Sequence, residues 1–205
     1  MRLPRLLLTF LRPRHSFGFG IQSPYAFWFL KQVLRQSSPY YKYSELAVAE
    51  RRLSAGQDED WLYEPRHQRR LLFRLVNEAQ PETIVDVGRL SASSLYLQAA
   101  KTTARYKSSP SFEALCLEAD EAVDFLYLHD HRHPDHISRM FDLCVQHKRE
   151  RSMFVIEGIR FSKDMTRAWE QMKQHPDVSL TFDLYNLGIL FFNPTLNHCH
   201  YTTSY

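Results

Sequence analysis

Glycine is scarce in this sequence of 205 residues, which contains six, and Gly88 is the only one between residues 57 and 157. Loops that cradle a nucleotide phosphate use several glycines, because the backbone must approach the ligand closely. The glycine count therefore argues against an intact glycine-rich nucleotide-binding loop in the middle of the chain.

Cysteine is also rare, and charge of one sign is not in excess. Cys116, Cys144 and Cys199 contain no C-x-x-C pair and would leave one thiol over in any disulfide scheme, which predicts a reducing, cytoplasmic location. The 26 Lys and Arg residues are mixed with 23 Asp and Glu residues, giving a net charge of +3. The chain therefore lacks the general excess of positive charge that is typical of nucleic-acid-binding proteins, and we expect no nucleic-acid partner.

Long hydrophobic runs are missing as well. The apolar run near the start, Leu6 to Leu11, is far shorter than the roughly 20 residues of a membrane span. We interpret it as a helical turn packed on the body of the protein, and we expect no membrane partner. A basic apolar surface that touches a membrane is the alternative.

Helical signals dominate residues 1–80, which we interpret as an amino-terminal helical extension or cap. Ser23 and Pro24 are typical of a helix start, and Pro65 precedes an apolar stripe through Leu71, Leu72 and Leu75.

Strand and helix patterns alternate after residue 80. Short β-branched or apolar strands are predicted at 83–88, 123–128 and 153–156, whereas 102–111 is predicted to be a polar loop. A tight turn separates the last two strands, 178–185 and 188–192, which must therefore be antiparallel. The pattern predicts an α/β domain over 81–205, with a Rossmann-like, mostly parallel sheet that ends in an antiparallel hairpin.

Two aromatic residues of this domain, Phe141 and Trp169, lie on apolar stripes of predicted helices. We expect both to be buried against the sheet.

Several segments resemble a bacterial branch of the class I S-adenosylmethionine-dependent methyltransferases; they are 19–27, 38–43, 84–88, 94–97, 159–176 and 178–192. The resemblance implies a seven-stranded sheet with a reversed last strand and S-adenosylmethionine as the cofactor. It places Asp86 and Gly88 at the cofactor turn after the first strand. It also implies an acidic residue at the end of the second strand that reads the ribose, for which Glu118 is the best candidate.

The sequence departs from the family pattern around this cofactor site. Arg89 and Leu90 are bulky in a turn where the family has small residues. Only residues 119–122 separate Glu118 from the next predicted strand, whereas a parallel crossover needs about a dozen residues. Either 114–118 is no strand, or a strand and at least one helix are missing, and we favour a truncated sheet.

A histidine-rich string, residues 129–136, follows a predicted strand. His131, His133, Asp135 and His136 resemble the zinc loop of metallo-β-lactamase-like hydrolases. On the methyltransferase frame, His129 instead takes the position of a metal-supporting aspartate. The string is open to three interpretations: a solvated loop and helix start, an adventitious or regulatory zinc or nickel site, or a catalytic metal site. We assign no metal ligand.

These observations favour a methyltransferase-fold protein with a degenerate S-adenosylmethionine pocket and a binding or structural role. Its partner would be an unidentified small molecule or protein. One alternative is an active methyltransferase that holds the cofactor with Asp86, Gly88 and Glu118. A second is a metal-dependent hydrolase that uses the cluster from His129 to His136. No catalytic residue is assigned.

Overall fold

The computed structural model describes residues 20–54, 64–89, 91–111 and 114–205. Its strands are β1 (Thr83–Val87), β2 (Arg105–Ser109), β3 (Val123–Leu128), β4 (Lys148–Glu157), β5 (Leu180–Asp183), β6 (Leu187–Phe191) and β7 (Cys199–Thr202). Its helices are α2 (Pro24–Phe29), the π-helical turn η1 (Leu30–Leu34), α3 (Lys42–Ser54), α4 (Arg66–Ala79), α5 (Ser93–Ala100), α6 (Pro134–Gln146) and α7 (Lys163–Lys173).

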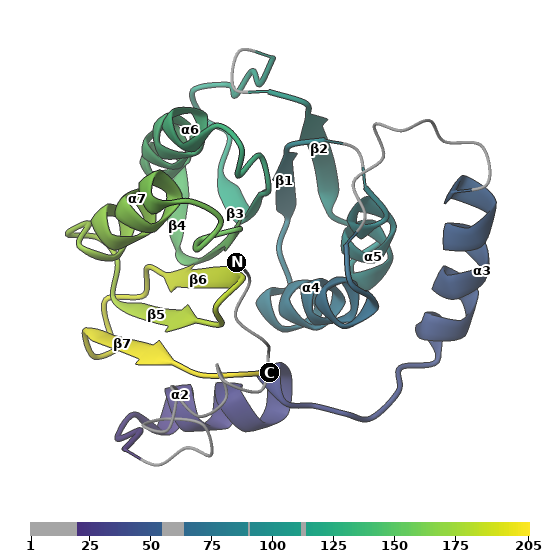
Figure 1. Ribbon diagram of the computed structural model, residues 1–205, viewed down its shortest axis with the longest axis horizontal. Helices are drawn as coiled ribbons and strands as arrows, with labels where there is room; N and C mark the ends of the chain where they lie inside the picture. Colours follow the sequence, from purple (N-terminus) through teal and green to yellow (C-terminus); the bar gives the residue numbers. More distant parts are fainter. Residues whose placement is uncertain (1–19, 55–63, 90, 112–113) are drawn as a thin grey trace.

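The strands form one sheet in the order β2-β1-β3-β4-β6-β5-β7 (Figure 1). Strand β6 runs antiparallel to both of its neighbours, β4 and β5, and every other neighbouring pair is parallel. The predicted α/β architecture, with a mostly parallel sheet and a closing hairpin, is confirmed.

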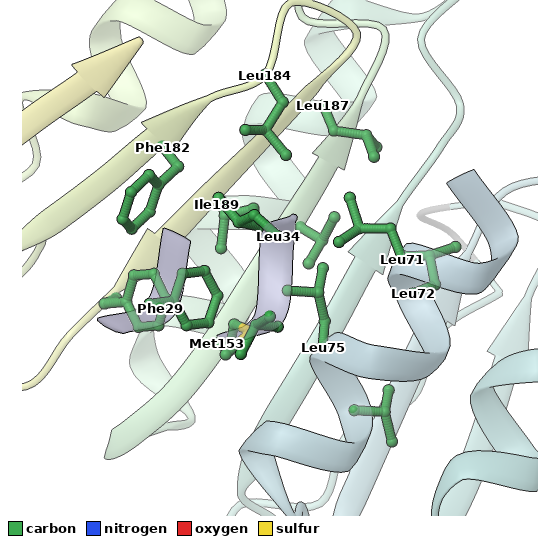
Figure 2. Close-up of a cluster of buried hydrophobic side chains, with 14 of the residues drawn as sticks. Phe29, Leu34, Leu71, Leu72, Leu75, Met153, Phe182, Leu184, Leu187 and Ile189 are labelled. Carbon is green, nitrogen blue, oxygen red and sulfur yellow. The ribbon is translucent and has the colours of Figure 1, made fainter. Parts of the chain in front are cut away.

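One face of the sheet packs against α2, η1 and α4. Figure 2 shows this core, in which side chains of α2, η1 and α4 contact those of the strands. The ring of Phe29 lies 5.1 Å from that of Phe191 and 5.2 Å from that of Phe182, measured between centroids. Helices that precede residue 80 therefore share a core with strands from the end of the chain.

The opposite face is covered by α6 and α7. Phe141 and Trp169 are 2% and 1% exposed, so the predicted burial of both residues is confirmed. A Cβ added at Gly188 of β6 would lie 2.5 Å from the ring of Trp169, so only glycine leaves room for the indole.

The segment 102–111 contains strand β2, so the prediction of a polar loop there was wrong. Its sequence, Arg-Tyr-Lys-Ser-Ser, is polar because β2 is an edge strand whose side chains are mostly exposed or half-buried. The segment 114–118 is not a strand. The true crossover from β2 to β3 therefore spans residues 110–122, long enough for a parallel connection.

The described residues place no strand outside β2, so the sheet ends there beside β1. At the opposite edge the tail strand β7 pairs in parallel with β5. Within the described residues, β2 is therefore the outer strand on one side of the sheet, and β7, near the end of the sequence, is the outer strand on the other.

None of the described helices is long and apolar enough to cross a membrane.

Candidate functional site

Ionisable and hydroxyl side chains gather at the carboxyl ends of three neighbouring parallel strands, β1, β3 and β4. Asp86 lies on β1, Tyr127 on β3 with His129 directly after it, and Glu157 ends β4. Glu64, just before α4, joins them from the helical side. All five are buried. Open α/β sheets bind ligands at this edge, so this cluster is the candidate site.

Asp86 is held by two neighbours within the sheet. The hydroxyl of Tyr106 on β2 donates a hydrogen bond to its Oδ2, and Nε2 of His129 lies 2.8 Å from its Oδ1. Burial and the Asp86 charge together raise the pKa of Tyr106, so this phenol stays protonated. Both carboxylate oxygens of Asp86 are therefore engaged by protein groups.

His129 is almost fully buried, and burial by itself lowers an imidazole pKa. The hydrogen bond and charge of Asp86, with the charges of Glu64 and Glu157, outweigh burial, so the pKa of His129 is raised. Its ring stacks on that of Tyr127, with centroids 4.7 Å apart. These contacts hold the imidazole in one orientation over the end of β1.

Gly88 lies directly under that imidazole. Its φ of +146° is a conformation that L side chains rarely adopt, and a Cβ at this position would lie 2.7 Å from Nδ1 of His129. The Cβ side of this glycine is therefore covered by the imidazole of His129.

Tyr127 joins two carboxyl groups through one hydroxyl. Its Oη lies 2.7 Å from Oε1 of Glu64 and 2.7 Å from Oε2 of Glu157. One hydroxyl has one proton to donate, so the second contact requires a carboxyl that keeps its own proton. Burial, followed by the charge of Glu157, raises the pKa of Glu64, which favours Glu64 as the carboxyl that keeps the proton.

Further polar groups complete the cluster. Nε2 of Gln68 on α4 donates to Oη of Tyr127 at 3.3 Å, and Oε1 of Gln68 accepts from Asn186 at 3.0 Å. The hydroxyl and backbone N–H of Ser93 both donate to Oε2 of Glu64. The arrangement can share and store a proton among buried groups.

Ligand atoms of Glu64, His129 and Glu157 lie within 4.8 Å of one another, a spacing that a metal ion could use. In the structure, however, Tyr127 already bridges the two carboxyls, and Asp86 already engages His129. Hydrogen bonds thus engage both carboxyls and Nε2 of His129 without a cation, whereas Nδ1 of His129 is buried with no hydrogen-bond partner.

Of the predicted cofactor residues, the structure brings Asp86 and Gly88 together but leaves Glu118 apart. Glu118 is exposed and lines a cavity of about 520 Å³ together with Thr83, Arg105 and Ala122, which lie where β1, β2 and β3 begin. That is the edge of the sheet opposite to the candidate site. Contrary to the prediction, Glu118 therefore does not end the second strand, because the segment before it is not a strand, and its role in reading a ribose stays a prediction.

The true second strand ends without an acid. β2 closes at Ser109, whose carbonyl accepts from the N–H of Gly88 at 2.9 Å, and residues 105–111 contain no Asp or Glu. Residues 112 and 113, like Leu90 in the cofactor turn, lie outside the described residues.

The histidine-rich string divides into two environments. The ring of His131 packs 4.4 Å from that of Phe161, measured between centroids, and against Gly158. Asp130, His133 and His136 instead form a half-exposed group at the start of α6, with ligand atoms within 4.8 Å of one another. The four residues of the zinc-loop pattern therefore do not gather as one set.

Two central residues, Glu64 and Tyr127, were missed by the sequence analysis. Glu64 precedes Pro65 at the edge of a loop, where nothing in the sequence distinguishes it from a solvated acid. Gln68 did carry a signal, because it is a polar residue within the apolar stripe of α4 and must find buried partners there.

Comparison with known proteins gives a structural match without a sequence match. No protein-family model matches the chain, and no curated protein does either. The O-methyltransferase TomG from Streptomyces achromogenes, solved in complex with SAM, aligns with a TM-score of 0.52 at 15% identity, over 80% of this chain and 94% of TomG. The chain has the class I methyltransferase fold.

Two further solved structures support the assignment of the methyltransferase fold. The SAH-bound methyltransferase PaMTH1 from Podospora anserina aligns with a TM-score of 0.57 at 9% identity, over 78% of this chain and 99% of PaMTH1. A methyltransferase from Geobacter sulfurreducens aligns with a TM-score of 0.54 at 10% identity, over 80% of this chain and 94% of its own. At these identities the likeness concerns the fold and not the activity.

Proposed function

We propose that this protein is a non-catalytic member of the methyltransferase fold, which binds a ligand or a partner and does not use S-adenosylmethionine. The observation that carries the proposal is the imidazole of His129 packed onto Gly88. In a working site of this fold the backbone at that glycine must remain open to the cofactor. Here a buried side chain, fixed by Asp86 and Tyr127, takes the space.

The residues around the Gly88 turn also argue against binding of S-adenosylmethionine. Asp86 is already engaged by Tyr106 and His129, and the residues from 105 to 111, which contain β2, supply no acid for a ribose. Arg89 adds a positive charge beside the position of a cationic sulfonium, which disfavours binding. The described residues of this turn and of β2 therefore do not fit S-adenosylmethionine, and we derive no methyl-transfer step.

The competing function is an active S-adenosylmethionine-dependent methyltransferase. Its support is the fold itself, because TomG and PaMTH1 were solved with SAM and SAH. For this chain to work in the same way, His129 would have to leave Gly88 and break its hydrogen bond to Asp86. The burial of that pair makes such an opening costly.

We also propose that the protein acts in a reducing compartment such as the cytoplasm. Its three cysteines are free, and Cys116 is exposed. An exposed thiol persists best where disulfides do not form.

Calorimetric titration with S-adenosylmethionine and with SAH tests the proposal directly. We expect no binding heat at millimolar ligand, whereas TomG titrated in parallel should bind. A His129→Ala variant, checked for folding by circular dichroism, tests whether the imidazole alone excludes the cofactor. Micromolar binding to the unmodified protein would overturn the proposal in favour of the active enzyme.

A further inference from the structure

A cavity of about 520 Å³ lies between η1, the start of α4 and the end of the chain. Its lining includes Arg35, Arg66, Arg70 and Arg74, but no side-chain carboxylate. The volume falls within the usual range of small-molecule sites. This cavity is distinct from the Gly88 turn, so its role does not depend on whether the cofactor is lost.

Three of these arginines form a ladder on α4. Arg66, Arg70 and Arg74 are spaced four residues apart and therefore lie on one face of the helix, where like charges destabilise each other. Within the described ranges no acidic side chain forms an ion pair with any of the three. The helix also begins here without a side-chain cap, since Pro65 precedes it, and a helix amino terminus adds further positive potential.

Arg74 is the most buried of these arginines, with 8% of the residue exposed. Its Nε donates to the carbonyl of Val33 at 2.7 Å and its Nη2 to the carbonyl of Leu34 at 3.0 Å, at the end of η1. These carbonyls fix the guanidinium in place without neutralising its charge by an acid.

Arg70 lies nearer the opening and is also held in position. Its guanidinium stacks over the ring of Tyr43 at 4.6 Å, and its Nε is buried without a hydrogen-bond partner. A buried donor that lacks an acceptor costs stability, so this guanidinium is held beside the cavity by packing rather than by a bound acid. Tyr43 and Leu34 also line the cavity, although both residues are almost fully buried.

We propose that this cavity binds a small molecule through a phosphate group. Guanidinium groups pair with phosphate oxygens through two parallel hydrogen bonds, and a ladder of them suits a doubly charged or diphosphate group better than a single carboxylate. The phosphate lies between Arg66, Arg70 and Arg74.

Titration of the full chain with sodium pyrophosphate and with inorganic phosphate tests the site. Calorimetry should show one pyrophosphate bound per chain, with weaker binding of phosphate. The melting temperature should rise more than in sodium chloride of matched ionic strength, because only a ligand selective for the folded state stabilises it in this way.

Two double variants separate the cavity from general charge effects. Arg66→Ala with Arg70→Ala should weaken pyrophosphate binding by about tenfold or more while retaining the native circular dichroism, since both residues lie outside the main core. Arg132→Ala with Arg167→Ala removes the same charge from exposed positions elsewhere and should leave the affinity unchanged. Equal loss in both variants would overturn the proposal.

Two further measurements also test the proposed phosphate site. A melting temperature that responds to pyrophosphate no more than to sodium chloride would overturn the proposal. Sedimentation with phosphatidylglycerol vesicles distinguishes a lipid headgroup from a soluble phosphate. Vesicle binding that pyrophosphate displaces and Arg66→Ala with Arg70→Ala abolishes would support the site and assign the headgroup as its source. Vesicle binding without any pyrophosphate response would refute it.

Discussion

The imidazole of His129 and the Cα of Gly88 are in such close contact that no side chain fits between them. A methyl group at residue 88 would lie 2.7 Å from Nδ1 of His129, and the backbone there has a φ of +146°. Glycine is thus required at this position for two separate reasons, one steric and one conformational.

Gly88→Ala should therefore destabilise the protein by about 2–5 kcal/mol, combining backbone strain with overpacking. Urea unfolding of Gly88→Ala, His129→Ala and the double variant separates the two contributions. Because truncating His129 relieves the clash, the double variant should lose clearly less stability than the sum of the single losses. Strict additivity would show that the two residues do not contact each other as described.

Glu64 should make stability fall as the pH rises. Burial raises the pKa of Glu64 above its ordinary value of 4.5, so the folded protein holds this proton more tightly than the unfolded chain. The stability that it contributes is complete below the unfolded pKa and is lost as the pH rises through the folded pKa. His129, whose pKa is also raised, acts in the same direction above its ordinary value of 6.5.

Glu64→Gln replaces the protonated carboxyl with a neutral group of similar size. The free energy of unfolding, measured in urea from about pH 5 to pH 9, should fall less with pH in this variant than in the unmodified protein. Glu45→Gln, at an exposed site on α3, is the matched control and should leave the profile unchanged. Parallel profiles for the Glu64 variant and the unmodified protein would contradict the assignment of the proton to Glu64.

Trp169→Ala should cost about 3–5 kcal/mol, because the indole is fully buried between α7 and the sheet and leaves a large cavity. Thermal unfolding measures the loss. Phe161→Ala provides the comparison, since its ring is 57% exposed and its removal should change stability by about 0.5 kcal/mol or less. An unchanged melting temperature in the Trp169 variant would refute the packing of α7.

Ser162→Ala should cost about 1 kcal/mol through the start of the same helix. The hydroxyl of Ser162 accepts the N–H of Met165 at 3.0 Å as the amino-terminal cap of α7. Ser162→Asp keeps an acceptor and should retain the stability in urea unfolding. Equal losses in the two variants would show that the cap does not act through this hydrogen bond.

The central strands could be predicted from sequence because burial on both faces leaves a recognisable apolar run. β1 and β3 have this character, and the hairpin of β5 and β6 adds a turn signal. The edge strands β2 and β7 could not, because exposed side chains give them polar sequences, Arg-Tyr-Lys-Ser-Ser and Cys-His-Tyr-Thr.

The candidate site was predictable only where it coincides with a strand end. Asp86 and Gly88 follow from the first strand, whereas Glu118 was assigned to a strand that does not exist. Glu64 and Tyr127 meet across 63 residues of chain, a contact that local patterns do not encode. Their pairing depends on the packing of α4 against β3, which becomes visible only in three dimensions.

The contact between Phe29 and the last strands has a consequence for biosynthesis. α2 leaves the ribosome early, but its apolar partners on β5 and β6 are made about 150 residues later, at a typical rate of roughly 5–20 residues per second. During those seconds the apolar side of α2 has no native partner, and the outer edge of β5 stays open until β7 is added. Until the segment 180–203 emerges, the nascent chain can therefore aggregate through the apolar side of α2 and through the unpaired edge of the sheet.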